Sequence, residues 1–160
     1  MNSAGDKIIF NTNGLEKILT GLDRPIVFTN GCFDILHRGH VDYLEQAAKF
    51  GKTLIVGLNT DESIKKLKKG DDRPINSLED RAAVLAAMGD INLIVPFDVE
   101  TPLELIQIIR PDILVKGGDW PEESIVGYDF VTQTGGKVKA IPFRFHRSTT
   151  GLLNRIRTGK

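Results

Sequence analysis

Five short apolar runs recur along the chain, and a longer stretch of helical character separates each run from the next. The runs are Ile26–Phe28, Leu54–Leu58, Leu93–Val95, Ile113–Val115 and the weaker Val138–Ile141. Each is short and apolar on both faces, as a strand inside a covered parallel sheet is. The alternation predicts an α/β fold, with a doubly wound, mainly parallel five-stranded sheet and helices on both faces.

The stretches between the runs carry helical periodicity and helix-start signals. Ser77 and Thr101 are predicted N-caps, and Pro102 suits the first position of a helix. Gly51 and Pro111 are predicted to end helices. The predicted inner faces are Val41, Leu44, Ala47 and Ala48; Val84, Leu85 and Met88; Leu105, Ile108 and Ile109; and Leu152, Leu153 and Ile156.

The length and charge of the chain fit one ordinary domain. We expect residues 1–160 to form a single domain with its core at about 24–157, loose ends at 1–12 and 157–160, and a mobile loop at 65–74. Twenty-one Lys and Arg balance 21 Asp and Glu. Zero net charge argues against binding nucleic acid or an anionic membrane by bulk charge alone.

Cysteine usage and the apolar segments indicate a reducing compartment. The single cysteine, Cys32, excludes an intrachain disulfide and a multi-cysteine metal site. No apolar run approaches the roughly 18–20 residues of a membrane span, and the first residues lack the layout of a secretory signal. We therefore expect a cytoplasmic protein with no membrane partner and no nucleic-acid partner.

The first predicted strand leads directly into a segment that favours phosphate. His37, Gly39 and His40 fall at the start of a helix, just past the end of that strand. A helix amino terminus offers free N–H groups and a positive dipole end, and each imidazole can donate an N–H to a phosphoryl oxygen. Gly39 would let a phosphate approach the backbone closely.

Two other interpretations of this segment stay open. One histidine could cap the helix while the other is merely exposed, or Asp34, His37 and His40 could hold a metal. Other nucleotide fingerprints are absent, since neither G-x-x-x-x-G-K-[ST] nor a strand-following G-x-G-x-x-G occurs. Gly135–Lys137 precedes a strand and is interpreted as a turn, and Cys32 as a buried thiol.

Several motifs together resemble a known superfamily. His37-Arg38-Gly39-His40 matches the H-x-G-H signature of the nucleotidyltransferases that include cytidylyltransferases and adenylyltransferases, and residues 30–37 resemble its G-x-F-D-x-x-H entry. Ser148-Thr149-Thr150 resembles its S-T-T motif. The segments 73–76, 79–81 and 114–120 resemble the D-glycero-β-D-manno-heptose 1-phosphate adenylyltransferases, which also occur as half of bifunctional kinase–adenylyltransferases. The resemblance covers about residues 24–157.

The resemblance implies a Rossmann-like nucleotidyltransferase fold and a specific reaction. A phosphate oxygen of heptose 1-phosphate would attack the α-phosphorus of ATP, giving ADP-heptose for lipopolysaccharide or surface polysaccharide and releasing pyrophosphate. Such a step depends on in-line positioning and on donors to the phosphoryl oxygens. The resemblance also implies Mg²⁺ with the ATP, and a homo-oligomer, either a dimer or larger.

The implied site residues fall into three groups. His37 and His40 would hold the triphosphate and stabilise the pentavalent α-phosphorus, helped by Lys68. Asp34, Arg73 and Arg81 would serve the sugar phosphate, and Asp34 would also organise Mg²⁺. The residues assigned to the nucleotide are Thr29, Asn30, Gly31, Cys32, Phe33, Gly39, Lys66, Gly117, Asp119, Arg147, Ser148, Thr149 and Thr150.

Simpler roles remain for several of these residues. Ser148 could be a plain N-cap, the lysines at 65–69 a solvated run, and Arg73 and Arg81 structural ion-pair residues. The segment 116–120 could be a turn plugged by Trp120. The rival functions are a cytidylyltransferase for glycerol 3-phosphate or a similar polyol phosphate, a nucleotide-binding regulatory module without turnover, and a scaffold whose histidines are incidental. The segment 143–147 leaves the choice of base open.

Overall fold

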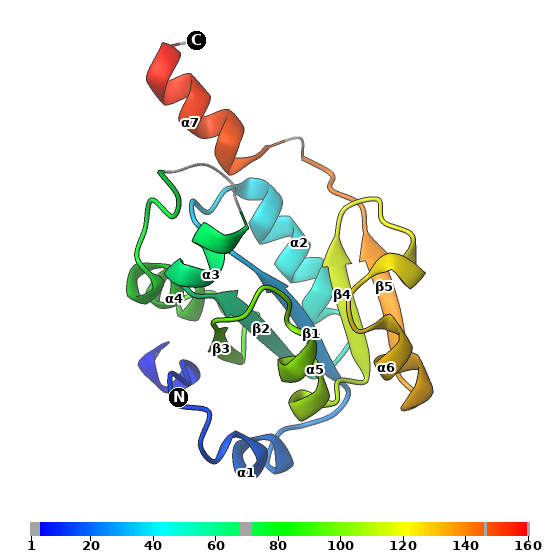
Figure 1. Cartoon of the computed structure of the whole chain (residues 1–160). Coiled ribbons are helices and arrows are strands. Elements are labelled where there is room, and N and C mark those ends of the chain that lie inside the picture. Colours follow the sequence, from blue (N-terminus) through cyan, green and yellow to red (C-terminus); the bar gives the residue numbers. More distant parts are fainter. Residues whose placement is uncertain (1–3, 68–71, 146, 160) are drawn as a thin grey trace.

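A single five-stranded sheet organises the molecule (Figure 1). The computed structural model describes residues 4–67, 72–145 and 147–159. All strands are parallel, in the order β3-β2-β1-β4-β5. The strands are β1 (Ile26–Gly31), β2 (Thr53–Asn59), β3 (Leu93–Phe97), β4 (Ile113–Gly117) and β5 (Lys137–Ile141). Each contains one of the apolar runs, which confirms the predicted fold class.

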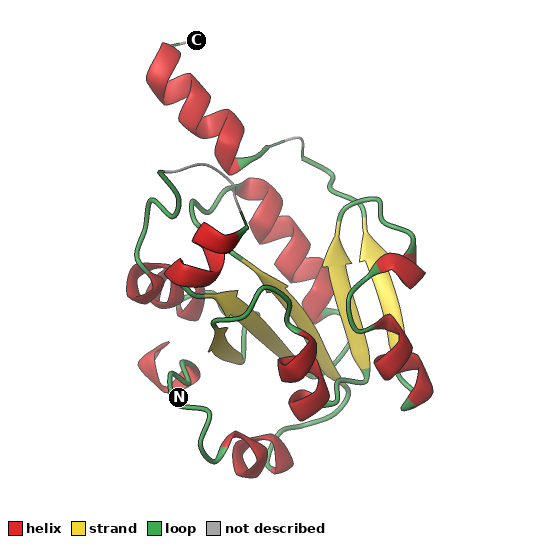
Figure 2. Ribbon diagram, in the orientation of Figure 1, coloured by secondary structure: helices red, strands yellow, loops and turns green. Residues whose placement is uncertain are grey.

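Helices cover both faces of the sheet, as expected for a doubly wound fold (Figure 2). Side chains alternate along β1, so that Val27 joins one buried cluster while Ile26 and Phe28 join the other. The first cluster packs under α2 (Arg38–Ala48) and α4 (Leu78–Ala86). The second packs under α1 (Leu15–Thr20), α5 (Leu103–Ile109) and α6 (Tyr128–Gln133).

The remaining elements are η1 (Ala4–Lys7), α3 (Asp61–Lys66), η2 (Glu122–Ser124) and α7 (Thr149–Thr158). The last two residues of α3, Lys65 and Lys66, fall in the stretch 65–74 that was predicted to be a loop, of which 68–71 lie outside the described residues. Thr60 caps this helix by accepting a hydrogen bond from the Ser63 amide. The described amino-terminal residues are attached rather than loose. Ile8 forms a parallel bridge with Ile94, and Lys7 Nζ donates to the Met88 carbonyl.

Four residues predicted to face inward are instead exposed: Val41, Val84, Ile108 and Ile156. In α2 the buried positions are Gly39, Tyr43, Leu44 and Ala47, so the inner face is rotated away from Val41. Helix α7 extends away from the body (Figure 1), which leaves Ile156 75% exposed. The predicted cap at Thr101 is also wrong, because the N-cap of α5 is Pro102, without a side-chain hydrogen bond.

The strand order places a topological switch point beside β1. The chain moves from β1 outward through β2 to β3, and then returns to the other side of β1 to form β4 and β5. Ligands of such sheets bind beyond the carboxyl ends of the strands at this point. Within the described residues, no helix has both the length and the apolar character needed to cross a bilayer.

Candidate active site

A crevice of about 500 Å³ opens at the carboxyl ends of β1 and β4. It brings together His37 and His40 of α2 with the Ser148–Thr150 start of α7, although more than 100 residues separate them in the sequence. Both helices therefore point their positive amino-terminal ends at one space. Its lining residues are Asn30, Gly31, Cys32, Phe33, Asp34, His37, His40, Tyr43, Arg73, Lys116, Gly117, Phe143, Arg147, Ser148, Thr149 and Thr150.

The two imidazoles are stacked against each other at the start of α2. Their ring centroids lie 3.8 Å apart, with an angle of 16° between the ring planes. The edge of Phe33 packs on His40, at 5.3 Å between ring centroids. Both Nδ1 atoms are buried, and neither has a hydrogen-bond partner among the described residues. Buried polar atoms without partners are rare, although a backbone hydrogen bond at Ile35 contributes to the pKa of His40.

Burial determines the protonation of the histidines. Removal from water lowers the pKa of His37. Burial, and then the proximity of His37, lower the pKa of His40 to about 4. Both rings are therefore neutral near pH 7 in the free protein. The negative charge of a bound triphosphate would act in the opposite direction and raise both pKa values.

The loop between β1 and α2 is shaped by close packing around its aromatic rings. Phe33 adopts a left-handed backbone with φ of 45°, a conformation that bulky residues rarely adopt. A side chain at Gly39 would meet the His37 ring at 3.1 Å and the Phe145 carbonyl at 3.3 Å. Gly39 itself does not line the crevice. It therefore makes room for His37, and the predicted close approach of a phosphate stays a prediction.

Asp34 is held by donors on all sides. Its carboxylate accepts from Arg73 Nε at 2.5 Å and from the amides of Ile75 and Asn76 at 2.9 Å each. Burial opposes its ionisation, but the hydrogen bonds from Asn76 and Ile75 and the charge of Arg73 outweigh this, so its pKa lies below the ordinary value.

These contacts change the role predicted for Asp34. The amide of Ile75 also donates to the second carboxylate oxygen, so each oxygen has two donors and no lone pair is left for a cation. No group of three or more His, Cys, Asp or Glu side chains among the described residues is arranged to hold a metal. We therefore assign Asp34 to positioning Arg73, which lines the crevice.

Arg81 lies below the crevice rather than in it. Its side chain is fully buried and donates to the carbonyls of Cys32 and Asn59, at 2.7 and 2.8 Å, where β1 and β2 end. It also donates to the Asn76 carbonyl and pairs with Asp61 at 2.6 Å. The predicted contact with a sugar phosphate is replaced by the structural alternative, because the guanidinium is enclosed by these acceptors and lines no part of the crevice.

Thr29 is likewise buried and lies outside the crevice. Its hydroxyl is hydrogen-bonded to the Tyr43 hydroxyl, and Tyr43 also donates to the Val115 carbonyl at 3.3 Å. Burial is the main cause that raises the pKa of Tyr43. The Thr29 side chain therefore braces α2 against the sheet, and the predicted contact with the nucleotide stays a prediction.

The start of α7 is tied to the same loop. Ser148 accepts from the Gly151 amide at 3.0 Å, so it is an N-cap as well as a lining residue. Thr149 donates to the Ile35 carbonyl at 3.4 Å. The preceding segment is held to α2, because Arg38 lies 3.8 Å from the Phe145 ring centroid and Arg144 pairs with Asp42.

Of three other predicted residues, two are described and do not line the crevice, and the third is not described. Lys66 donates to the Asp98 carbonyl at 3.1 Å and lines no part of it. Lys68 lies outside the described residues. Asp119 is exposed and is not a lining residue, whereas Gly117 is.

A smaller cavity of about 320 Å³ adjoins the crevice on the other side of β1. The two share Asn30, Gly31, Cys32 and Lys116. The wall of this cavity includes Trp120, whose Nε1 donates to the Gly117 carbonyl at 3.1 Å. Its other lining residues are Asn59, Leu67, Glu100, Thr101, Pro102, Ser124, Ile125 and Val126.

The sequence analysis did not assign Tyr43, Lys116, Phe143 or the residues that line the smaller cavity alone to the site. For Lys116 a signal existed, since it ends an apolar strand at the edge of the sheet where ligands bind. For the aromatic residues none did, because their buried positions follow from tertiary packing.

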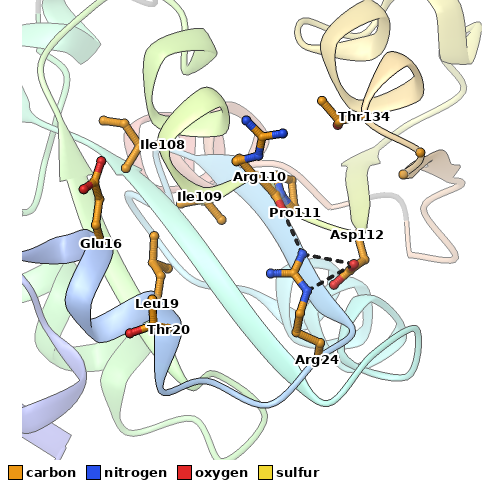
Figure 3. A pocket seen from close by; sticks show the side chains of 12 residues that line it. Glu16, Leu19, Thr20, Arg24, Ile108, Ile109, Arg110, Pro111, Asp112 and Thr134 are labelled. Carbon is orange, nitrogen blue, oxygen red and sulfur yellow. Dashed lines mark hydrogen bonds and ion pairs between the residues drawn. The ribbon is translucent and has the colours of Figure 1, made fainter.

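Another cavity, of about 500 Å³, lies at the opposite end of the sheet (Figure 3). In it, Arg24 pairs with Asp112 at 3.0 Å and donates to the Arg110 carbonyl. Asp112 in turn accepts from the Ile26 amide at 2.6 Å. None of the predicted site residues lies here, and it is far from the carboxyl ends of the strands.

Comparison with known proteins gives consistent matches. The model of the cytidylyltransferase-like family matches residues 28–148. A D-beta-D-heptose 1-phosphate adenylyltransferase from Bordetella bronchiseptica is 56% identical over 96% of this chain and 95% of its own length. The bifunctional protein HldE from Magnetococcus marinus is 52% identical over 84% of this chain, which corresponds to 28% of that longer protein.

Among solved structures, a lipopolysaccharide core biosynthesis protein from Thermoplasma volcanium has a TM-score of 0.62 at 24% identity, covering 76% of this chain and 98% of its own. A pantoate–beta-alanine ligase from Francisella tularensis also has a TM-score of 0.62, at 18% identity, covering 90% of this chain and 69% of its own. At these identities the likeness shows the fold alone.

Proposed function

The chain belongs to the cytidylyltransferase-like family of nucleotidyltransferases, and we propose that it is the adenylyltransferase that joins AMP from ATP to D-glycero-β-D-manno-heptose 1-phosphate. The products are ADP-heptose, for lipopolysaccharide or surface polysaccharide, and pyrophosphate. The observation that carries the proposal is the single crevice formed by the histidine pair and the start of α7, with a second cavity joined to it.

The larger crevice suits the nucleotide. Two helix amino termini, two neutral imidazoles and the guanidinium of Arg73 all offer donors, and the carboxylate in the described lining is already paired with Arg73. This is the environment that a triphosphate needs. The smaller cavity, with its mixture of apolar and polar walls, then receives the sugar. Its volume of 320 Å³ falls within the ~300–1,000 Å³ typical of small-molecule sites.

In the proposed step, an oxygen of the sugar phosphate forms a bond to the α-phosphorus while the bond to the bridging oxygen of the β-phosphate breaks. His37 and His40 donate N–H groups to the phosphoryl oxygens that gain charge. Arg73, oriented by Asp34, and the backbone N–H groups of Thr149 and Thr150 hold the departing pyrophosphate. Positioning and preorganised donors supply the rate enhancement, since such transfers need little covalent help.

Mg²⁺ is proposed to enter as part of the substrate, MgATP. The described residues do not form a resident metal site, because the carboxylate of Asp34 is saturated by donors. The predicted help from Lys68 stays a prediction. We also propose a homo-oligomer acting in the cytoplasm, which light scattering and cell fractionation would test.

The relatives do not favour the cytidylyltransferase alternative. The Bordetella protein, which this chain matches at 56% identity over nearly its full length, is named for a heptose 1-phosphate adenylyltransferase. A panel of ATP and CTP against heptose 1-phosphate and glycerol 3-phosphate, with pyrophosphate as the readout, tests the proposal. Preference for CTP, or release that does not depend on the acceptor, would reject it.

A further inference from the structure

Lys116 occupies the boundary between the two cavities. It is the penultimate residue of β4 and is half-buried, and it lines both the crevice and the smaller cavity. Its Nζ donates to Asn30 Oδ1 at 3.4 Å, and Asn30 likewise lines both cavities. The two side chains therefore lie where the cavities adjoin.

The sheet itself opens at this point. β1 and β4 are paired at Val27 with Ile113 and at Phe28 with Leu114, whereas β4 stays paired with β5 as far as Gly117. Beyond Leu114 the backbone ladder between β1 and β4 thus ends, and Asn30 and Lys116 meet through their side chains. This is the switch point at which ligands of parallel sheets bind.

The charges near Lys116 favour an anion. The described residues that line the two cavities include three cationic side chains, Arg73, Lys116 and Arg147, against two carboxylates, Asp34 and Glu100. Asp34 is already paired with Arg73, and Lys116 Nζ donates to the amide oxygen of Asn30 over 3.4 Å. An ammonium in such a place can gain stronger, charge-assisted hydrogen bonds from a phosphate.

We propose that Lys116 is a catalytic residue that binds the phosphate of the acceptor as it passes from the smaller cavity to the α-phosphorus. This inference rests on the proposed function. The attacking phosphate and the triphosphate are both anions, and a cation between them reduces their repulsion. Lys116 transfers no proton: the acceptor oxygen bonds to the α-phosphorus, and pyrophosphate leaves with the electrons of the broken bond.

The test compares three variants with the wild type. Lys116→Met removes the charge and keeps the aliphatic stem, and Lys116→Arg keeps the charge. Lys139→Met is the matched control, because Lys139 lies on neighbouring β5, pairs with Glu122 at 3.6 Å and lines neither cavity. Thermal unfolding of each variant verifies that it folds.

In steady-state pyrophosphate assays, we expect Lys116→Met to lower kcat/KM for heptose 1-phosphate by roughly 10- to 100-fold, the effect of losing a charged contact. The Kd for ATP should stay within about threefold, a change of less than 1 kcal/mol. Lys116→Arg should recover most of the activity. An unchanged kcat/KM, or an equal loss in Lys139→Met, would overturn the proposal.

A second measurement does not depend on the identity of the sugar. Inorganic phosphate is titrated calorimetrically into protein saturated with a non-hydrolysable ATP analogue. Weaker binding by Lys116→Met, but not by Lys139→Met, supports the assignment. Equal binding by all variants, or no binding by the wild type, contradicts it. If the wild type instead transfers AMP to none of the acceptors, the proposed function fails while this titration still decides the role of Lys116.

Discussion

Arg73 donates its Nε to Asp34 across 2.5 Å, and both side chains are almost completely removed from solvent. The pair links the loop after β1 to the segment that precedes α4, and both residues line the crevice. Asp34, the acidic residue of the resembled entry motif, is thus paired with a cation of the protein itself.

Asp34→Asn should therefore destabilise the fold and slow the reaction together. An amide presents donors to the donors of Arg73, Ile75 and Asn76 and leaves a buried cation unpaired, which typically costs about 3–5 kcal/mol. Urea denaturation measures the loss. Lys65→Met, which breaks the exposed pair with Glu62, is the control and should change stability little. If Asp34→Asn were as stable as the wild type, the buried pair of Asp34 and Arg73 would not contribute to the stability of the fold.

Mg²⁺ alone should not stabilise the protein. Because Asp34 has no free lone pair, the ion is expected to bind only together with a nucleotide. We expect millimolar MgCl₂ to leave the melting temperature unchanged, and MgATP to raise it by the mass-action effect of a ligand that binds only the folded state. A rise with Mg²⁺ alone that Asp34→Asn abolishes would restore the metal role.

Stability should fall in mild acid because of His40. Its pKa is about 4 in the folded protein, against an ordinary value of 6.5, so the unfolded chain binds the extra proton between these values. The free energy of unfolding should then decrease as pH falls from 6.5 toward 4, by on the order of 3 kcal/mol, and this residue should contribute no slope above about pH 7.

The matched control for this pH dependence is His40→Asn, which cannot titrate. Denaturation curves at several pH values give the free energy of unfolding, which should change less steeply with pH in the variant than in the wild type between pH 6.5 and 4. The same pH dependence in both proteins would mean that burial does not lower the pKa of His40. Bound ATP should shift the titration upward, so its affinity should rise more steeply toward pH 6 in the wild type than in the variant.

The hydroxyl pair of Thr29 and Tyr43 should be strongly coupled. Removing one partner leaves the other buried and less well satisfied, at a cost of about 1–3 kcal/mol, whereas removing both is less costly than the sum. Thr29→Val, Tyr43→Phe and the double variant form a double-mutant cycle in chemical denaturation. Additive losses would argue that the two hydroxyls do not depend on each other.

The strands and the loop after β1 were predictable because their signals are local. Uninterrupted apolar runs mark buried strands, and the H-x-G-H segment lies immediately after the first of them. The orientation of side chains was harder to predict. Val41 suits the inner face by periodicity, but Tyr43 occupies that face because its hydroxyl finds partners on β1 and β4.

Arg81 illustrates the same limit for charged residues. Its acceptors come from three separate segments, at Cys32, at Asn59 and Asp61, and at Asn76, and only the folded chain brings them together. From the sequence alone, an arginine at this position could either bind a phosphate or be a buried residue that holds segments of the fold together. The same holds for Asp34, whose saturation by donors depends on the path of residues 73–76.

One assay decides whether the stacked histidines act on the phosphates of ATP. Pyrophosphate release from ATP, Mg²⁺ and heptose 1-phosphate is compared between the wild type and His40→Asn. Lys139→Met is the control for a substitution outside both cavities. We predict acceptor-dependent release by the wild type and the control, and a kcat lower by about 10²–10³-fold in His40→Asn. Equal turnover by His40→Asn would contradict the account.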